Sequence, residues 1–227
     1  MTQDIYLLFI FLAIVASVFY YFKNEKRYLN TNKIILGLLV FVLLFEIAGN
    51  YTANRNINNL LLYNICWVYL ESLLIIGYFY MMHKQAMVKR VIMITGSIVL
   101  LISLLNGIWL ESFVGEFQYN SFAMFSILIL GLCLHFLFQI QKFKVYQNHN
   151  ILAVPHFWIV VGIFFFYLEA LITFGVIFNV VGLEHRIVFG LMYFNRIMAA
   201  AMYIFLGFSF YSQYLFKNPS KGLIADY

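Results

Sequence analysis

Seven long apolar segments make up most of the chain, and short polar segments separate them. The apolar segments cover about residues 5–22, 34–51, 60–82, 91–110, 117–140, 155–180 and 188–215. A helix needs roughly 20 apolar residues to cross the hydrocarbon core of a bilayer, and each segment is close to or above that length. The pattern predicts an all-α polytopic membrane protein, a seven-transmembrane-helix bundle built as a single domain over residues 1–227.

Composition supports this prediction and excludes an ordinary soluble domain. Hydrophobic residues make up 64% of the chain and charged residues 10%, against about 45–50% and about 25% in a typical soluble domain. Lipid is therefore the expected surrounding of the bundle. The net charge of +5 gives no indication of nucleic-acid binding, because the position of the charges is explained by membrane topology.

Lysine and arginine are concentrated on alternate connections between the apolar segments. Eleven of the fourteen lie on the connections that begin after the first segment: Lys23, Lys26, Arg27, Lys33, Lys84, Lys89, Arg90, Lys142, Lys144, Lys217 and Lys221. The opposite connections hold Arg55 and Arg186. The positive-inside rule then predicts an outer N-terminus and a cytoplasmic C-terminus. The acidic residue before the first segment and the basic residues after it favour a retained span over a cleaved signal peptide. The short loops favour a cell (inner, cytoplasmic) membrane of bacterial type.

Five ionisable side chains lie within the predicted spans: Glu46, Glu71, His135, Glu169 and Arg196. A charge near the middle of the bilayer costs about 2.5–3.5 kcal/mol on insertion scales, so these groups are expected to face the bundle interior and to have partners. His135 lies alone on an apolar segment and in the inner half, and it is interpreted as a core residue instead of a ligand.

Helical spacing brings further polar residues onto the same faces as these charges. Glu46 and Asn50 are four apart, and Asn64 and Glu71 are seven apart with Trp67 between them, so each pair is expected to share a helix face. At 1.5 Å per residue, most of the set falls in the outer half of the membrane, with Glu71 near the middle. The sequence predicts a ligand or ion pocket formed by Glu46, Asn50, Asn64, Trp67, Glu71, Glu169, Asn195, Arg196 and Tyr203.

The charges of this predicted pocket do not balance. Three carboxyl groups accompany a single guanidinium group. We expect Arg196 to pair with one glutamate, and at least one other glutamate to be protonated or to meet a cation, because an uncompensated carboxylate is costly in a low dielectric. The alternative is that the same groups only hold the helices together.

Several chemistries are not indicated by the sequence. It contains no His-Glu-x-x-His motif, no glycine-rich phosphate loop and no aspartate within a span, and the last span has no lysine that could form a retinal Schiff base. Cys66 and Cys133 lie within apolar segments and are interpreted as buried thiols. No metal site and no cofactor are predicted.

The function that this pattern favours is a small transporter or small-molecule sensor coupled to protons or cations. Transport is preferred to sensing because no soluble output domain accompanies the spans. Two alternatives stay open: an intramembrane enzyme that acts on a lipid or isoprenoid with a glutamate as general acid or base, and an oligomeric pore or structural membrane subunit. The bilayer and a small molecule or ion are the expected partners, and a homo-oligomer or a partner membrane protein is left open.

Overall fold

The protein is an all-helical bundle in a computed structural model that describes residues 3–22, 28–142 and 150–216. Within these residues, seven helical segments are long and apolar enough to cross a membrane, which confirms the predicted fold class. The elements are α1 Gln3–Phe22, α2 Leu29–Asn54, α3 Leu60–Tyr63, η2 Asn64–Glu71, α4 Ser72–Met82, α5 Ala86–Trp109, α6 Tyr119–Lys142, η3 Ile151–Ala153, α7 Pro155–Asn179, α8 His185–Phe208, η4 Ser209–Tyr211 and α9 Ser212–Leu215.

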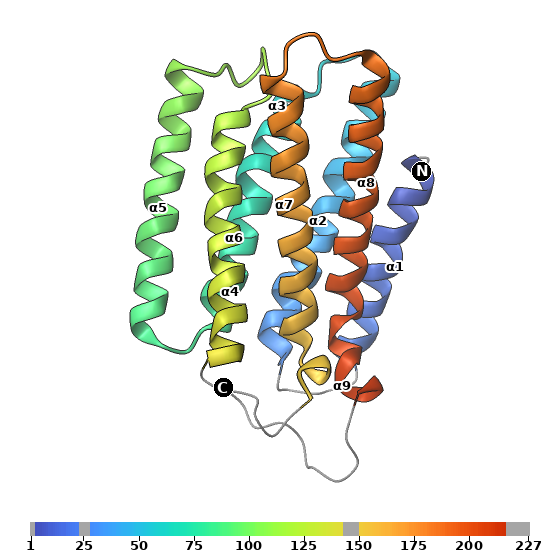
Figure 1. Cartoon of the computed structure of the whole chain (residues 1–227). Helices are drawn as coiled ribbons and strands as arrows, with labels where there is room; N and C mark the ends of the chain where they lie inside the picture. The colour runs from blue at the N-terminus through green and yellow to red at the C-terminus, as the bar shows by residue number, and fades with distance from the viewer. Residues whose placement is uncertain (1–2, 23–27, 143–149, 217–227) are drawn as a thin grey trace.

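The helices form a ring with one helix outside it. Contacts run from α1 to α2, from α2 to α4, from α4 to α6, and through α7 and α8 back to α1. Helix α5 packs against α4 and α6 and stands at the edge of the bundle (Figure 1). The ring closes tightly, because a Cβ atom on Gly207 of α8 would lie 2.5 Å from the backbone of Ala13 in α1.

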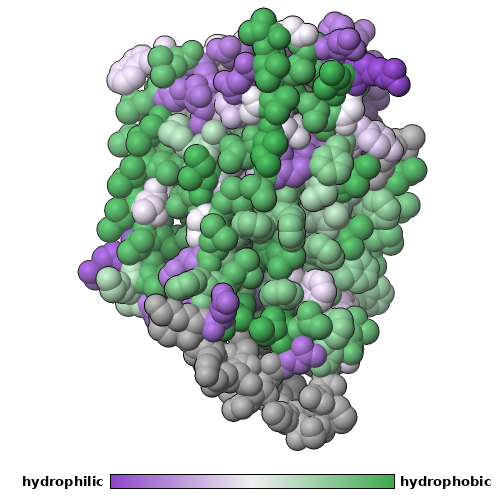
Figure 2. All heavy atoms as spheres, in the orientation of Figure 1, coloured by the Kyte–Doolittle hydropathy of each residue, from purple (hydrophilic) through white to green (hydrophobic). Residues whose placement is uncertain are grey.

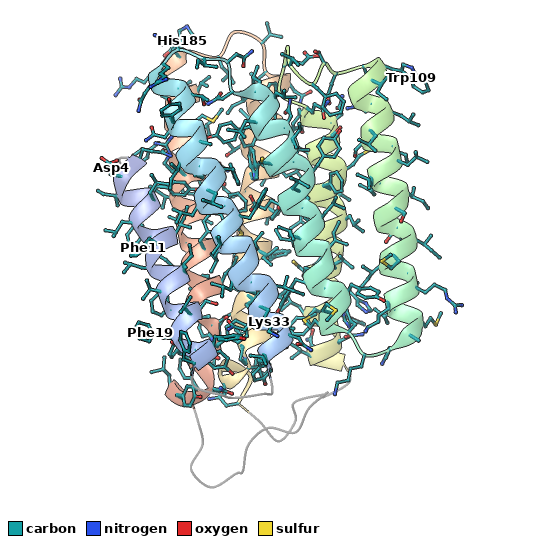
Figure 3. All side chains as sticks on the ribbon, turned by 180° about the vertical axis from the view of Figure 1, so that it is seen from behind. Asp4, Phe11, Phe19, Lys33, Trp109 and His185 are labelled. Carbon is teal, nitrogen blue, oxygen red and sulfur yellow. The ribbon has the colours of Figure 1, made fainter. Side chains whose placement is uncertain are left out.

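The outer surface of the bundle is suited to lipid. Apolar side chains cover the middle of the visible face, and polar residues gather near its two ends (Figure 2). Large hydrophobic residues such as Phe19, Leu44 and Phe189 are exposed on several helices, as expected where acyl chains replace water as the solvent. Asp4, Trp109 and His185 lie toward one end of the bundle and Lys33 toward the other (Figure 3).

The predicted orientation relative to the cytoplasm stays a prediction. Among the basic residues used for it, Lys33, Lys84, Lys89 and Arg90 lie within the described residues. The others, Lys23, Lys26, Arg27, Lys144, Lys217 and Lys221, together with the side chain of Lys142, lie outside them. Below, "outer" denotes the end of the bundle that holds the loop from α5 to α6 and the loop from α7 to α8.

A π-helix interrupts the third span. Residues Leu60–Met82 form one continuous span, but Asn64–Glu71 within it adopt π-helical hydrogen bonding. A π-helix bonds residue i to i+5 instead of i+4, and such interruptions are frequent at functional sites. The return to α-helical bonding falls at Glu71 and Ser72, near the middle of the span.

Helix α8 is poorly covered at its outer end. Helix α1 begins well below the outer ends of α2 and α8 (Figure 1). Phe189 and Tyr193 of α8 are 74% and 50% exposed. The space beside the outer half of α8 is therefore open to the bilayer.

Candidate functional site

A partly enclosed cavity of about 390 Å³ lies in the outer half of the bundle. Helices α1, α2 and α8 and the π-helix all contribute to it, and so do the first turn of the third span and α7. One wall is polar and is formed by Tyr6, Glu46, Tyr63, Asn195, Arg196 and Tyr203. A second part of the lining is aromatic and is formed by Trp67, Phe117, Phe166, Phe174 and Phe178.

Glu46 on α2 is the acid of the polar wall, and it accepts three hydrogen bonds. Its Oε1 atom accepts a hydrogen bond of 3.2 Å from the Tyr6 hydroxyl, and its Oε2 atom accepts bonds of 3.3 Å from Tyr63 Oη and Gln3 Nε2. Both oxygen atoms of Glu46 are therefore already hydrogen-bonded to neighbouring side chains.

Arg196 is part of the same polar wall but forms no ion pair with this carboxyl group. Its charge acts on Glu46 and on Tyr63. Among the described residues, however, no carboxylate oxygen lies within 4.0 Å of a guanidinium nitrogen of Arg196. The side chain is exposed and lines the cavity. The expected Arg196–glutamate pair is thus not formed, and the guanidinium group is available to a ligand.

Glu71 lies deeper than Glu46 and is completely buried. Its Oε1 atom accepts a hydrogen bond of 3.0 Å from the hydroxyl group of Tyr203, which lines the cavity. Its Oε2 atom has no hydrogen-bond partner among the described residues. The two rings that connect the acids, Tyr6 and Tyr203, have centroids 6.3 Å apart, and Glu46 and Glu71 act on one another electrostatically.

The aromatic wall is a packed cluster instead of scattered interfacial residues. Trp67 of the π-helix lies 5.5, 5.0 and 5.2 Å from the ring centroids of Phe117, Phe122 and Phe174. Phe117 stacks on Phe174 and Phe178 at 5.1 and 5.5 Å. Such a wall offers a rigid apolar surface to the body of a ligand, beside the polar groups that would fix its orientation.

Besides the buried Glu71, three of the predicted pocket residues lie away from the cavity lining. Asn64 donates two hydrogen bonds of 2.9 Å to the backbone carbonyls of Phe113 and Glu116 and accepts one from the backbone N–H of Gln118. Asn50 accepts a bond from Asn54 at the outer end of α2.

Glu169 is the third of these residues. It accepts hydrogen bonds on both oxygens, from Thr173 at 2.6 Å and Asn195 at 2.9 Å. Asn195 also lines the cavity, so Glu169 supports the cavity wall from behind.

The π-helix explains why Asn64 and Glu71 separate. In an α-helix a spacing of seven residues places two side chains on one face. Each π-turn takes up one more residue, so over Asn64–Glu71 this relation is lost. Asn64 consequently faces the loop from α5 to α6, and Glu71 faces Tyr203 on α8.

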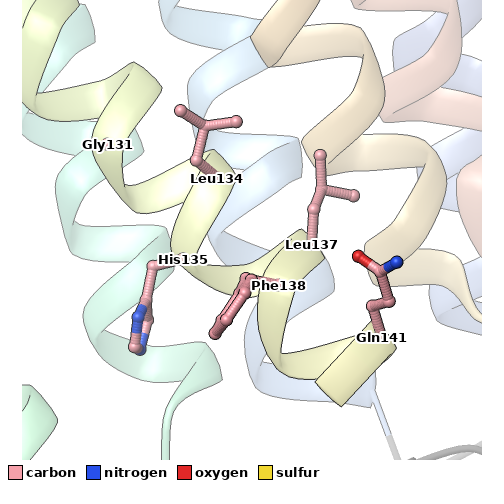
Figure 4. A pocket seen from close by; sticks show the side chains of 6 residues that line it. All are labelled: Gly131, Leu134, His135, Leu137, Phe138 and Gln141. Atoms are coloured by element: carbon pink, nitrogen blue, oxygen red, sulfur yellow. The ribbon is translucent and has the colours of Figure 1, made fainter.

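His135 lies in the inner half of α6, away from the cavity. It contributes to a shallow hollow lined by Gly131, Leu134, His135, Leu137, Phe138 and Gln141 (Figure 4). All six come from one helix, and His135 and Gln141 point in different directions, so the hollow has no convergent polar groups. His135 interacts with Gln139 at 2.9 Å.

Sequence reasoning missed the tyrosines of the polar wall. Tyr6 and Tyr63 had no assigned role, although each bonds to Glu46. Both lie inside the outer part of a span, and a tyrosine there needs a partner for its hydroxyl group. The sequence could have indicated this cluster, because Tyr6, Glu46 and Tyr63 are polar residues at similar depth on three consecutive spans.

No protein family, no curated protein and no solved structure matches this chain at a significant level. Within the described residues, no cluster of three or more His, Cys, Asp or Glu side chains is arranged to hold a metal ion. The site must therefore be interpreted from its own geometry.

Proposed function

We propose that this chain is a small transporter that binds an amphipathic molecule with an anionic head group in the outer cavity. The observation that carries the proposal is Arg196, a guanidinium group without an ion-pair partner in the described chain that lines a 390 Å³ cavity. A charge held within a bilayer usually marks a substrate pathway or meets a partner. An anionic head group is the partner that Arg196 lacks.

The remaining walls specify the other parts of such a ligand. The aromatic cluster around Trp67 and Phe174 suits an apolar body, because aromatic side chains dominate apolar ligand pockets. Asn195 can donate a hydrogen bond beside Arg196. Glu46 already accepts hydrogen bonds from three donors, so it does not compete with a ligand for the guanidinium group of Arg196.

The uncovered outer half of α8 supports entry from the membrane. Phe189 and Tyr193 are exposed beside the cavity-lining residues Met192 and Arg196. An amphipathic molecule partitions into the outer leaflet with its head group at the interface. It would then reach the cavity sideways, next to the short α1.

Binding can be tested with three probes that share one chain and differ in head group. Purified protein in nanodiscs is titrated with bromine-labelled dodecanoate, dodecanol and dodecylamine, and quenching of Trp67 fluorescence reports occupancy. We expect dodecanoate to bind best, and Arg196→Gln to weaken it at least about 10-fold, which corresponds to about 1.4 kcal/mol. Arg186→Gln, on the same helix but outside the cavity lining, is the matched control.

The variant Trp67→Phe removes the tryptophan in the cavity, so the quenching that it loses is the part that reports binding in the cavity. Equal quenching by all three probes, or an unchanged dodecanoate affinity in Arg196→Gln, would overturn the proposal. Transport itself is tested by flux of dodecanoate into liposomes that contain the protein. Saturable flux that Arg196→Gln abolishes is expected, and binding without flux would favour a sensor.

A further inference from the structure

Three buried oxygen atoms below the cavity have no hydrogen-bond partner within the described part of the chain. They are Glu71 Oε2, Ser72 Oγ and the hydroxyl oxygen of Tyr167. All three side chains are 0% exposed. Leaving a buried polar group unpaired costs about 1–3 kcal/mol, so three such atoms together require an explanation.

These atoms belong to one place in the bundle. Glu71 and Ser72 are consecutive, and Tyr167 on α7 interacts with the charge of Glu71 and with the side chain of Ser72. The place lies behind Tyr203, whose hydroxyl group bonds to the other oxygen of Glu71. It is therefore separated from the outer cavity by one side chain.

The charge of Glu71 is not compensated by the protein. Tyr203 and Glu46 are the groups that act on it, and the second of these is itself an acid. The guanidinium group of Arg196 acts on Glu46 and Tyr63 instead. A single positive charge would neutralise the site. A proton on Glu71 would do so too, but its single O–H group could donate to only one of the two neighbouring hydroxyl groups.

A small cation meets both requirements at once. Hard cations take oxygen ligands, including carboxylates and hydroxyl groups. A monovalent cation beside one carboxylate gives a neutral site, whereas a divalent ion would leave an excess positive charge. The backbone is also suited to this role. The π-helix ends at Glu71, and π-helical interruptions are frequent at functional sites.

We propose that Glu71, Ser72 and Tyr167 form a binding site for one sodium ion. This inference deepens the proposed function by naming the coupling ion, and Tyr203 provides the link, since it lines the cavity and bonds to Glu71. Binding of the ion itself requires no substrate. The two proposals can therefore fail separately.

The test is the effect of Na⁺ on thermal unfolding of the full chain in detergent. NaCl replaces choline chloride or KCl at constant ionic strength, and no amphipathic probe is added. A ligand that binds only the folded state raises the unfolding midpoint, and we expect a rise of about 5 °C in NaCl that saturates. Glu71→Gln should abolish the rise, and Ser72→Ala should weaken Na⁺ binding about 10-fold.

Two variants serve as matched controls. Glu169→Gln alters a carboxyl group whose two oxygens are both hydrogen-bonded. Ser103→Ala alters a buried serine on α5 whose hydroxyl group is also unpaired among the described residues. Both should keep the full response to Na⁺. If Glu71→Gln does not fold, Ser72→Ala against Ser103→Ala decides the question.

Two results would overturn the sodium site. One is an equal unfolding midpoint in NaCl, KCl and choline chloride. The other is an infrared spectrum in which the band of a protonated Glu71 is present and unaffected by Na⁺, which would assign the site to a proton and an internal water. A response to Na⁺ that survives in Arg196→Gln would leave this site standing even if the anionic ligand were not found.

Discussion

Two polar regions occupy the outer half of the bundle, and they use the same residue types in different ways. In the loop region around Asn64, Asn106 and Gln118, acids and amides bond to one another and to the backbone. In the cavity region, Arg196 has no ion pair within the described residues and Glu71 has an unpaired oxygen. A polar group that its neighbours satisfy supports the fold, whereas a polar group that faces a cavity without a partner is available to a ligand.

In the loop region, most of the polar side chains are hydrogen-bonded to their neighbours. Asn106 donates bonds of 2.6 Å to Glu111 and 2.9 Å to Ser121, and Tyr69 donates one of 2.7 Å to Gln118. With the three bonds of Asn64, these contacts fix the loop from α5 to α6 against the π-helix. Phe117, at the end of this loop, then stands in the aromatic wall. The loop region therefore positions one side of the cavity.

The largest expected effect comes from Asn64→Ala. It removes three hydrogen bonds and leaves two carbonyl groups and one N–H group without their partner. At about 1 kcal/mol for each bond, stability should fall by about 3 kcal/mol. Thermal unfolding in detergent measures the loss. The fraction that remains folded should still bind dodecanoate, and a selective loss of binding at unchanged stability would place Asn64 in the site after all.

A smaller effect is expected from Gly49→Ala. A Cβ atom at position 49 would lie 2.7 Å from the hydroxyl oxygen of Tyr63, which would have to move away from Glu46. Dodecanoate affinity should change about 3-fold or more, equivalent to about 0.7 kcal/mol, with little change in unfolding temperature. The control is Gly37→Ala, because an added Cβ atom there meets no neighbour within 4 Å. Identical behaviour of the two variants would argue against a role for Tyr63.

The pH dependence of stability provides a check at the inner end of the bundle. Burial, together with the nearby His135 and Lys89, lowers the pKa of His83 to about 4. The unfolded chain, with an ordinary histidine pKa of about 6.5, therefore binds more protons between pH 6.5 and 4. Stability should fall as the pH is lowered through this window, by about 1–2 kcal/mol at pH 5.

The measurement is unfolding temperature against pH for the wild type and His83→Gln. The variant should lose this part of the pH dependence. Because His83 lies far from the cavity lining, binding of dodecanoate at pH 7 should be the same in both proteins. An equal pH dependence in the two would contradict the assignment to His83.

The smallest effect is expected from Glu169→Gln. Thr173 and Asn195 hold both oxygens of Glu169, and a glutamine with a reoriented Asn195 can keep two hydrogen bonds. Stability and dodecanoate affinity should change by less than about 0.5 kcal/mol. A loss of dodecanoate binding comparable to that of Arg196→Gln would show that Glu169 belongs to the cavity region as a functional acid.

Much of the fold could be predicted from the sequence, because the bilayer sets a length that each apolar segment must meet. The seven spans follow from that requirement alone. The pocket was harder to predict. Glu46, Trp67, Asn195, Arg196 and Tyr203 line one cavity, but Asn64 does not, since helical spacing assumes α-geometry and the sequence gives no signal for the π-helix over Asn64–Glu71.

The partners of the charged groups were also predicted incorrectly. A count of acids and bases indicates that Arg196 should pair with a glutamate. It does not reveal that hydroxyl groups from Tyr6 and Tyr63 already satisfy Glu46. Tertiary packing decides which of several oxygens a guanidinium group meets. The sequence thus indicates where polar groups accumulate, and only their arrangement separates a support from a site.

The contact between Gly207 and Ala13 has a consequence for biogenesis. Helix α8 is made after the six other long spans of the described chain, yet it supplies Asn195, Arg196 and Tyr203. While the ribosome is still making it, Glu46 and Glu71 are already in the membrane without those neighbours. The contact between α1 and α8 at Gly207 would then be the last to form during insertion. An added Cβ atom there would lie 2.5 Å from the α1 backbone, so the two helices must pack closely to complete the cavity.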